Sequence, residues 1–81
     1  REMEIKILGT GCPKCKRLEE VTREAVAAAG VEATITKVTD ISAIMAYSIL
    51  STPGLVINEQ VKAAGRLPSK EEIMAWLRET Q

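Results

Sequence analysis

The sequence predicts one α/β domain with the element order β-α-β-α-β-β-α, spanning residues 1–81. Two observations carry this prediction. Short runs of alternating β-branched and polar residues are typical of strands, and longer segments with apolar residues at helical spacing lie between or after them. The expected strands are Met3–Leu8, Glu32–Thr39, Thr52–Asn58 and Gln60–Gly65, and the expected helices are Pro13–Ala29, Ile41–Ser48 and Ser69–Glu79.

The first helix has marked ends. Pro13 suits the first helical position, where its missing N–H costs nothing, and Gly30 stands where a C-terminal cap belongs. The expected buried stripe is Leu18, Val21, Ala25 and Ala28. The charged residues read as a solvated outer face: Lys16, Arg17, Glu19, Glu20, Arg23 and Glu24. Because this helix connects two strands, those strands are expected to be parallel with a right-handed crossover.

The second half carries turn and cap signals. Asp40 is a candidate N-cap for the short second helix, and Asn58-Glu59 is a plausible tight turn between the last two strands. Ser69 with Glu72 three residues later forms a capping box that opens the final helix. Its expected buried stripe is Ile73, Trp76 and Leu77. A hairpin followed by a helix is therefore predicted.

The composition excludes several classes of function. Eleven basic and eleven acidic residues cancel, whereas a nucleic-acid protein needs a cationic face. No apolar run resembles a membrane span or signal peptide, so we expect a cytoplasmic protein without a membrane partner. We also expect a monomer. With two aromatic side chains, Tyr47 and Trp76, the core must be aliphatic.

The two cysteines of the chain lie in the stretch LGTGCPKCKR, as Cys12-Pro13-Lys14-Cys15. Such a pair can be a metal site, a structural staple or a redox couple. A staple is disfavoured because the loop it closes is very short and reducing compartments rarely hold permanent disulfides. The proline within the pair, at a strand-to-helix junction, favours the redox interpretation.

The predicted helix start assigns different roles to the two thiols. Cys12 falls at or beside the N-cap, where unpaired N–H groups and the helix dipole favour its thiolate, and Lys14 adds positive charge. Cys12 is therefore the predicted nucleophile, which forms a mixed disulfide with a substrate. Cys15, one turn along and facing inward, is the predicted resolving thiol.

A second short motif, Ser51-Thr52-Pro53-Gly54-Leu55, precedes the third strand. On these residues alone it reads as an ordinary Pro-Gly turn, because few X–Pro bonds are cis.

With these pieces in order, the chain resembles the thioredoxin fold, and more closely the small glutaredoxin-sized redox-active disulfide proteins of archaea and bacteria. The resemblance rests on Gly11–Cys15 at the first strand–helix junction, on Thr52-Pro53 and on Gly65 after the fourth strand. It covers residues 3–79. It implies a four-stranded mixed sheet flanked by three helices.

The resemblance also implies site roles. Pro53 is expected to be cis and to lie against the cysteine pair, with Thr52-Pro53 receiving the backbone of a protein substrate and Gly65 allowing close approach. No cofactor or metal is expected to be bound. A thioredoxin-reductase-type partner is expected to restore the dithiol, so the implied activity is reduction of protein disulfides.

The sequence departs from the family pattern at several places. Thioredoxins carry Trp where Gly11 stands, and they bury an acid in the strand that leads to the site, where this chain offers Lys6. The proton acceptor for Cys15 is thus unidentified. The dipeptide between the cysteines is Pro-Lys, which matches neither thioredoxins nor glutaredoxins, so the substrate class stays open.

Four alternatives stand beside protein disulfide reduction. A copper carrier also uses a CxxC pair at a first strand–helix junction, but such domains run β-α-β-β-α-β and lack the Thr-Pro loop. Structural zinc needs four ligands, which one chain with two Cys and no His cannot supply. A glutathione-linked glutaredoxin and a redox sensor without turnover keep the fold and change the reaction.

Overall fold

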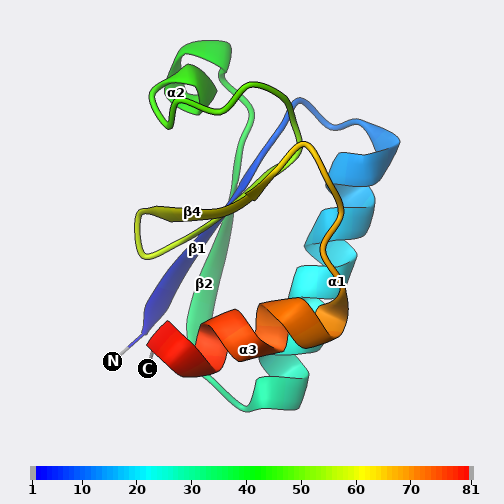
Figure 1. Ribbon diagram of the computed structural model, residues 1–81, viewed down its shortest axis with the longest axis vertical. Helices are drawn as coiled ribbons and strands as arrows, with labels where there is room; N and C mark the ends of the chain where they lie inside the picture. The colour runs from blue at the N-terminus through cyan, green and yellow to red at the C-terminus, as the bar shows by residue number, and fades with distance from the viewer. Residues whose placement is uncertain (1, 81) are drawn as a thin grey trace.

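The computed structural model describes residues 2–80 and has the predicted element order (Figure 1). The elements are β1 (Met3–Leu8), α1 (Pro13–Ala29), β2 (Ala33–Val38), α2 (Ile41–Met45), β3 (Gly54–Ile57), β4 (Gln60–Ala64) and α3 (Lys70–Thr80). Within the described residues, no helix combines the length and apolar content that a membrane crossing requires.

The strands form a four-stranded mixed sheet in the order β2-β1-β3-β4. β1 pairs with β2 in parallel, and β3 pairs with both β1 and β4 in the antiparallel sense. In this register Leu8, the last residue of β1, lies opposite Gly54, the first residue of β3. The segment that follows β1, starting at Gly9, therefore meets the segment that precedes β3, ending at Pro53, at one edge of the sheet.

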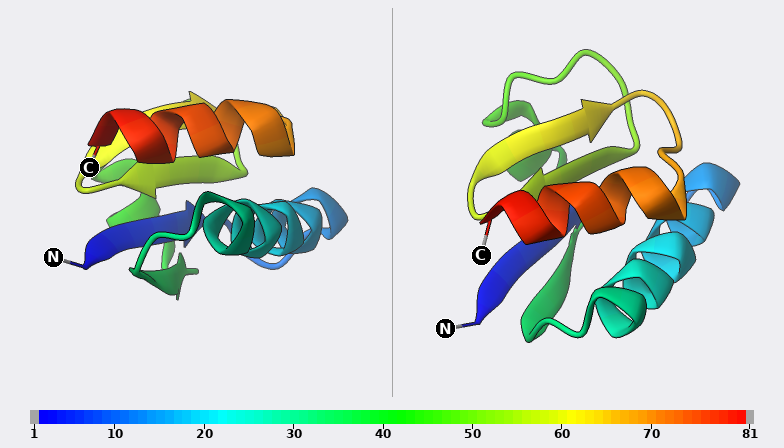
Figure 2. Two further views of the ribbon diagram at one scale, coloured as in Figure 1. Left: turned by 90° about the horizontal axis from the view of Figure 1, so that it is seen from below. Right: turned by 60° about the horizontal axis from the view of Figure 1, so that its bottom comes forward.

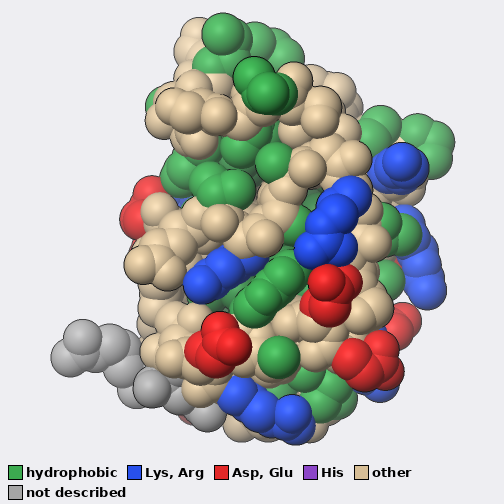
Figure 3. All heavy atoms as spheres, in the orientation of Figure 1, with side chains coloured by type: hydrophobic (Ala, Val, Ile, Leu, Met, Phe, Trp, Pro, Cys, Tyr) green, Lys and Arg blue, Asp and Glu red, His purple; other side chains and the backbone are tan. Residues whose placement is uncertain are grey.

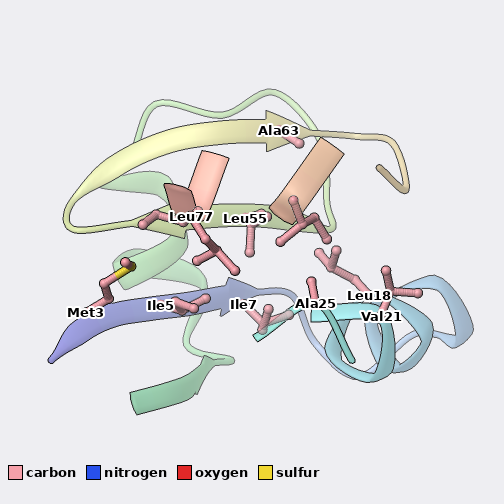
Figure 4. Close-up of a cluster of buried hydrophobic side chains, with 11 residues drawn as sticks. Met3, Ile5, Ile7, Leu18, Val21, Ala25, Leu55, Ala63 and Leu77 are labelled. Atoms are coloured by element: carbon pink, nitrogen blue, oxygen red, sulfur yellow. The ribbon is translucent and has the colours of Figure 1, made fainter. Parts of the chain in front are cut away.

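Side chains that alternate along the strands build a core on each face of the sheet. The larger core packs β1 and β3 residues such as Ile5 and Leu55 against α1 and α3 (Figure 4). Figure 2 shows α3 lying alongside α1 on this face. On the opposite face, Leu8 and Val56 pack against Ile44 of α2. The core is aliphatic, as the composition predicts.

The predicted caps are present. Gly30 adopts the left-handed conformation with φ 68° and closes α1. The Ser69 hydroxyl accepts from the N–H of Glu72 at 3.1 Å, and the Glu72 carboxylate accepts from the N–H of Ser69 at 2.9 Å, so the capping box is confirmed. The turn at Asn58 and Glu59 is confirmed as well, with φ values of 48° and 67°.

Some expected boundaries and buried positions are wrong. The second helix ends at Met45 rather than near Ser48. The N–H groups of Tyr47 and Ser48 donate three residues back, to the carbonyls of Ile44 and Met45, and Ser48 then adopts φ 59°. In α1 the stripe continues from Ala25 to Ala29, which packs on the core, and Ala28 is exposed. The shift from Ala28 to Ala29 follows from helix geometry. One turn is 3.6 residues, so the residues that face the core are spaced by three or four along the helix.

Trp76 is only half-buried, in contrast to the fully buried Ile73 and Leu77 beside it. It packs on the edge of the core, and the guanidinium of Arg66 lies 6.0 Å from its ring centroid. The indole thus covers the core from outside.

A polar cluster on the α2 side ties three segments together. The Nζ of Lys6 in β1 donates to the Tyr47 hydroxyl at 2.9 Å and to the carboxylate of Glu59 in the hairpin turn, and the Tyr47 hydroxyl donates to the same carboxylate. Hydrogen bonds to Glu59 and Tyr47 hold the pKa of Lys6 well above its usual value, and the Lys6 bond lowers the pKa of Glu59. Lys6 therefore takes part in a local ion pair rather than in chemistry at the cysteines.

Candidate active site

Cys12 and Cys15 lie where β1 leads into α1, and they are joined by a disulfide with their Cα atoms 4.9 Å apart. Cys12 is the N-cap of α1, and its Sγ accepts from the N–H of Cys15 at 3.1 Å. Cys12 is partly exposed, whereas Cys15 is 5% exposed and faces the sheet. The two sulfurs thus differ in access, with Cys12 on the outside.

The start of α1 is electropositive. Its first turn contains no acidic residue, while Lys14 and Lys16 are exposed there. Free N–H groups of the first turn and the helix dipole act in the same direction. A thiolate released at Cys12 is therefore stabilised by its surroundings.

Gly9 is the point where the cysteine pair meets the proline loop. A Cβ on Gly9 would overlap the Sγ of Cys15 and would lie 3.9 Å from the Cα of Pro53. The residue at this position must lack a side chain for Cys15 and Pro53 to approach each other as they do. The pairing of Leu8 with Gly54 brings these segments together.

The Thr52–Pro53 peptide bond is cis, as the resemblance predicts. Pro53 is buried and Thr52 is exposed beside it. The N–H of Gly65 donates to the Pro53 carbonyl at 2.8 Å, and Gly65 has φ 76°. A Cβ there would also overlap the Ser51 hydroxyl. The structure therefore brings Thr52, Pro53 and Gly65 to the edge of the sheet that holds the cysteines.

Comparisons with known proteins agree with this geometry. A family model described as a thioredoxin domain matches residues 3–78. The chain belongs to the thioredoxin family. It is 41% identical over 71 residues to a thioredoxin from Methanothermobacter thermautotrophicus, covering 88% of this chain and 92% of that protein. It is 40% identical over 74 residues to a thioredoxin from Methanocaldococcus jannaschii, covering 91% of this chain and 85% of the relative.

The fold is shared more widely than the sequence. The solution structure of oxidised thioredoxin from Plasmodium falciparum superposes with a TM-score of 0.63 at 16% identity, covering 99% of this chain and 82% of that one. Family membership together with the Cys12–Cys15 disulfide establishes that this protein is a thiol–disulfide oxidoreductase.

An exposed apolar surface borders the thioredoxin-family site and was missed by sequence reasoning. Ile41, Met45 and Leu50 are 57%, 68% and 102% exposed. With Thr10 and Thr52 they line a shallow hollow of about 280 Å³. In Figure 3 hydrophobic side chains gather over α2 at the top of the molecule. The spacing of Ile41 and Met45 marks one helix face, but only the tertiary structure shows that this face is uncovered.

A second hollow, of about 90 Å³, lies beside the inner cysteine. It is lined by Cys15, Lys16 and Glu19 from α1 and by Lys37 from β2, among others. The Glu19 carboxylate accepts from Arg23 at 2.9 Å and lies 3.6 Å from the Nζ of Lys37, and its side chain is only 20% exposed. Arg23 and Lys37 lower the pKa of Glu19, the Arg23 hydrogen bond most. The expectation that Glu19 lies on the solvated outer face of the helix is wrong, because most of its side chain is covered.

The side chains around the cysteine pair do not form a group of metal ligands among the described residues. Among residues 2–80 no three His, Cys, Asp or Glu side chains are grouped so that they could hold a metal ion. The two thiols of the site are engaged with each other in the disulfide.

Proposed function

We propose that this thioredoxin-family protein reduces disulfides of protein substrates, with Cys12 as the attacking thiol and Cys15 as the resolving thiol. The observation that supports this assignment most is the difference in their positions. Cys12 is partly exposed at the N-cap of α1, and Cys15 is buried one turn further on, within disulfide reach. A bulky substrate disulfide has access to Cys12 alone.

The reaction proceeds by two exchanges. The Cys12 thiolate attacks one sulfur of the substrate disulfide, the S–S bond breaks, and the other substrate sulfur leaves as a thiolate that takes a proton from solvent. Cys15 then loses its proton and attacks the Cys12 sulfur, which releases the second substrate thiolate and forms the Cys12–Cys15 disulfide. Two electrons pass from the protein to the substrate. The second step is intramolecular and benefits from the fixed geometry of the helical turn.

The loop at Thr52-Pro53 and the backbone at Gly65 are the proposed binding surface for the substrate chain. Thr52 is exposed next to the buried Pro53, and the hydrogen bond between Gly65 and Pro53 holds the two segments together. The apolar residues Ile41 and Leu50 continue this surface away from the cysteines. Uncovered apolar area beside a reactive pair favours a folded or partly folded protein as the substrate, since monomers seldom expose such patches without function.

The exposed side chain of Lys14 lies in the first turn of α1, next to Cys12, where its charge is proposed to lower the pKa of the Cys12 thiol. A reductase of the thioredoxin-reductase type is the proposed electron donor, with no cofactor held by this chain. The one-domain organisation over residues 1–81 is part of the same proposal, and the expected cytoplasmic monomer stays a prediction.

A glutathione-linked route and a copper carrier are the competing functions. The observed placement of α2 between β2 and β3 differs from the β-α-β-β-α-β order of copper-carrying domains. For glutathione, one cysteine suffices, so the two routes differ in their need for Cys15.

Single-cysteine variants test the proposal. With a disulfide-bonded protein substrate and a chemical reductant, Cys12→Ser is expected to abolish reduction. Cys15→Ser is expected to accumulate a mixed disulfide through Cys12, visible as an added mass that dithiothreitol removes. Full turnover by Cys15→Ser, with glutathione as the reductant, would refute the two-thiol mechanism and support the glutathione route.

A further inference from the structure

The hollow beside Cys15 raises a question that the two exchange steps leave unanswered. Thiolates, not thiols, attack disulfides, so Cys15 must lose a proton before it can attack Cys12. Burial in apolar surroundings raises the pKa of a thiol, and Cys15 is 5% exposed. The proton therefore needs a path from a buried sulfur to solvent.

The hollow provides space for such a path. Its volume of about 90 Å³ is several times the ~10–15 Å³ that one water molecule requires, and Cys15 and Glu19 both line it. Glu19 is four residues after Cys15 in α1, so the two side chains lie on the same helix face. The Glu19 carboxylate and the buried Cys15 thiol thus border the same small hollow, which has room for water.

Its negative charge distinguishes Glu19 from the other residues that line the hollow. The other charged residues that line it are Lys16 from α1 and Lys37 from β2, and neither can accept a proton in its charged form. Arg23, which donates to Glu19, is also a cation. The lining residues of β1 and the segment after it carry no charge, so Glu19 is the one carboxylate that the described lining presents.

We propose that Glu19 accepts the proton of Cys15 through water in this hollow when Cys15 resolves the mixed disulfide. The proton passes from the Cys15 Sγ to water and on to the Glu19 carboxylate, and the electron pair left on sulfur attacks Cys12. The Cys12–substrate bond breaks, and the departing substrate thiolate is protonated by solvent or by Glu19. Arg23 and Lys37 hold the Glu19 carboxylate in place. Because they also lower its pKa, Glu19 stays ionised and acts as a weak base that takes the proton only transiently, before passing it to solvent. This inference rests on the proposed role of Cys15.

An aromatic disulfide reagent that releases a coloured thiolate at each exchange separates the two steps. Mixed in slight excess with the fully reduced full-length chain, it gives a first phase for attack by Cys12 and a second phase for resolution by Cys15. Glu19→Gln is expected to leave the first phase unchanged at pH 7. The second phase is expected to slow by on the order of 10- to 100-fold, at or below the low end of general-base contributions. This deficit is expected to shrink above about pH 9, where solvent deprotonates the thiol directly.

The sign of the effect separates proton transfer from simple electrostatics. Removing a negative charge beside Cys15 leaves Lys16 and Lys37 and favours the thiolate, so an electrostatic role alone predicts a faster second phase. A faster or unchanged second phase would overturn the proposal, as would an equal slowing of both phases at every pH. If wild type released only one coloured thiolate per chain, the role of Cys15 itself would be refuted instead.

Matched variants control for folding. Glu20→Gln removes a neighbouring carboxylate that pairs with Arg17 at 3.1 Å and does not line the hollow, and it is expected to leave both phases and the pH profile unchanged. Glu19→Asp keeps the carboxylate and is expected to recover part of the second-phase rate. A slow Glu19→Asp variant with a wild-type melting temperature and the same pH profile as Glu19→Gln would also count against the proposal.

Discussion

Replacing Gly9 by alanine perturbs the contact between the first strand and the buried cysteine. The new Cβ would overlap the Cys15 Sγ and would lie 3.3 Å from the Cys15 Cβ. In the oxidised protein the disulfide fixes that sulfur, so either the strand or the helix must shift. In the reduced protein the free thiol can rotate away. Gly9→Ala is therefore expected to destabilise the oxidised form more than the reduced form.

The size of the effect follows from the overlap. Inserting a methyl group into a packed interior costs about 1–3 kcal/mol, and most of that cost is expected in the oxidised form. For a two-electron couple, about 30 mV corresponds to 1.4 kcal/mol, so the reduction potential should become less negative by roughly 20–65 mV. The same difference should appear as a larger loss of melting temperature in the oxidised protein.

The assay is equilibration of the variant in glutathione or dithiothreitol buffers, with alkylation to count thiols. Gly30→Ala is the matched control, since φ 68° makes alanine strained there and nothing lies within 4 Å of its Cβ. It should lower stability without moving the potential. An unchanged potential in Gly9→Ala, or an equal shift in Gly30→Ala, would refute the steric argument.

Three further predictions concern stability. Thr22 is fully buried and its hydroxyl has no hydrogen-bond partner among the described residues. Thr22→Val should therefore raise the free energy of unfolding, measured by urea titration, by about 1 kcal/mol. A lower free energy of unfolding would contradict this. Ser69→Ala removes the cap that bonds Glu72 and should cost about 1 kcal/mol, measured the same way. Glu59 has a lowered pKa because of its hydrogen bond from Lys6, so its stabilising contribution is present above the ordinary carboxyl pKa of ~4.3 and is lost as pH falls through the lower folded value. Glu59→Gln should therefore flatten the loss of stability below pH 4.3, and an unaltered acid profile would count against the ion pair.

The features that sequence predicted best are those with local causes. Pro13 and Gly30 delimit the long helix, and Ser69 opens the last one, because caps act within a single turn of backbone. The placement of Cys12 and Cys15 followed from the same local geometry. The cis bond before Pro53 did not follow from its own residues and came from the resemblance to a family.

The features that sequence did not predict depend on which elements meet. Glu19 reads as one charge among several on an outer helix face, and only the tertiary structure brings Lys37 of β2 to it and places both beside Cys15. The early end of α2 at Met45 and the exposure of Leu50 likewise depend on how the chain must turn to enter β3. Periodicity describes a face but does not say what covers it.

The central claim is that Cys12 and Cys15 form a working dithiol–disulfide couple. The most direct test is a redox titration of the purified protein, with alkylation and mass readout of each cysteine and metal analysis of the same sample. The account predicts one reversible two-electron transition in which both thiols appear together, and a potential near ~−270 mV would suit a reductase. Cysteines that stay reduced across the whole range, in a protein that holds copper or zinc, would contradict it.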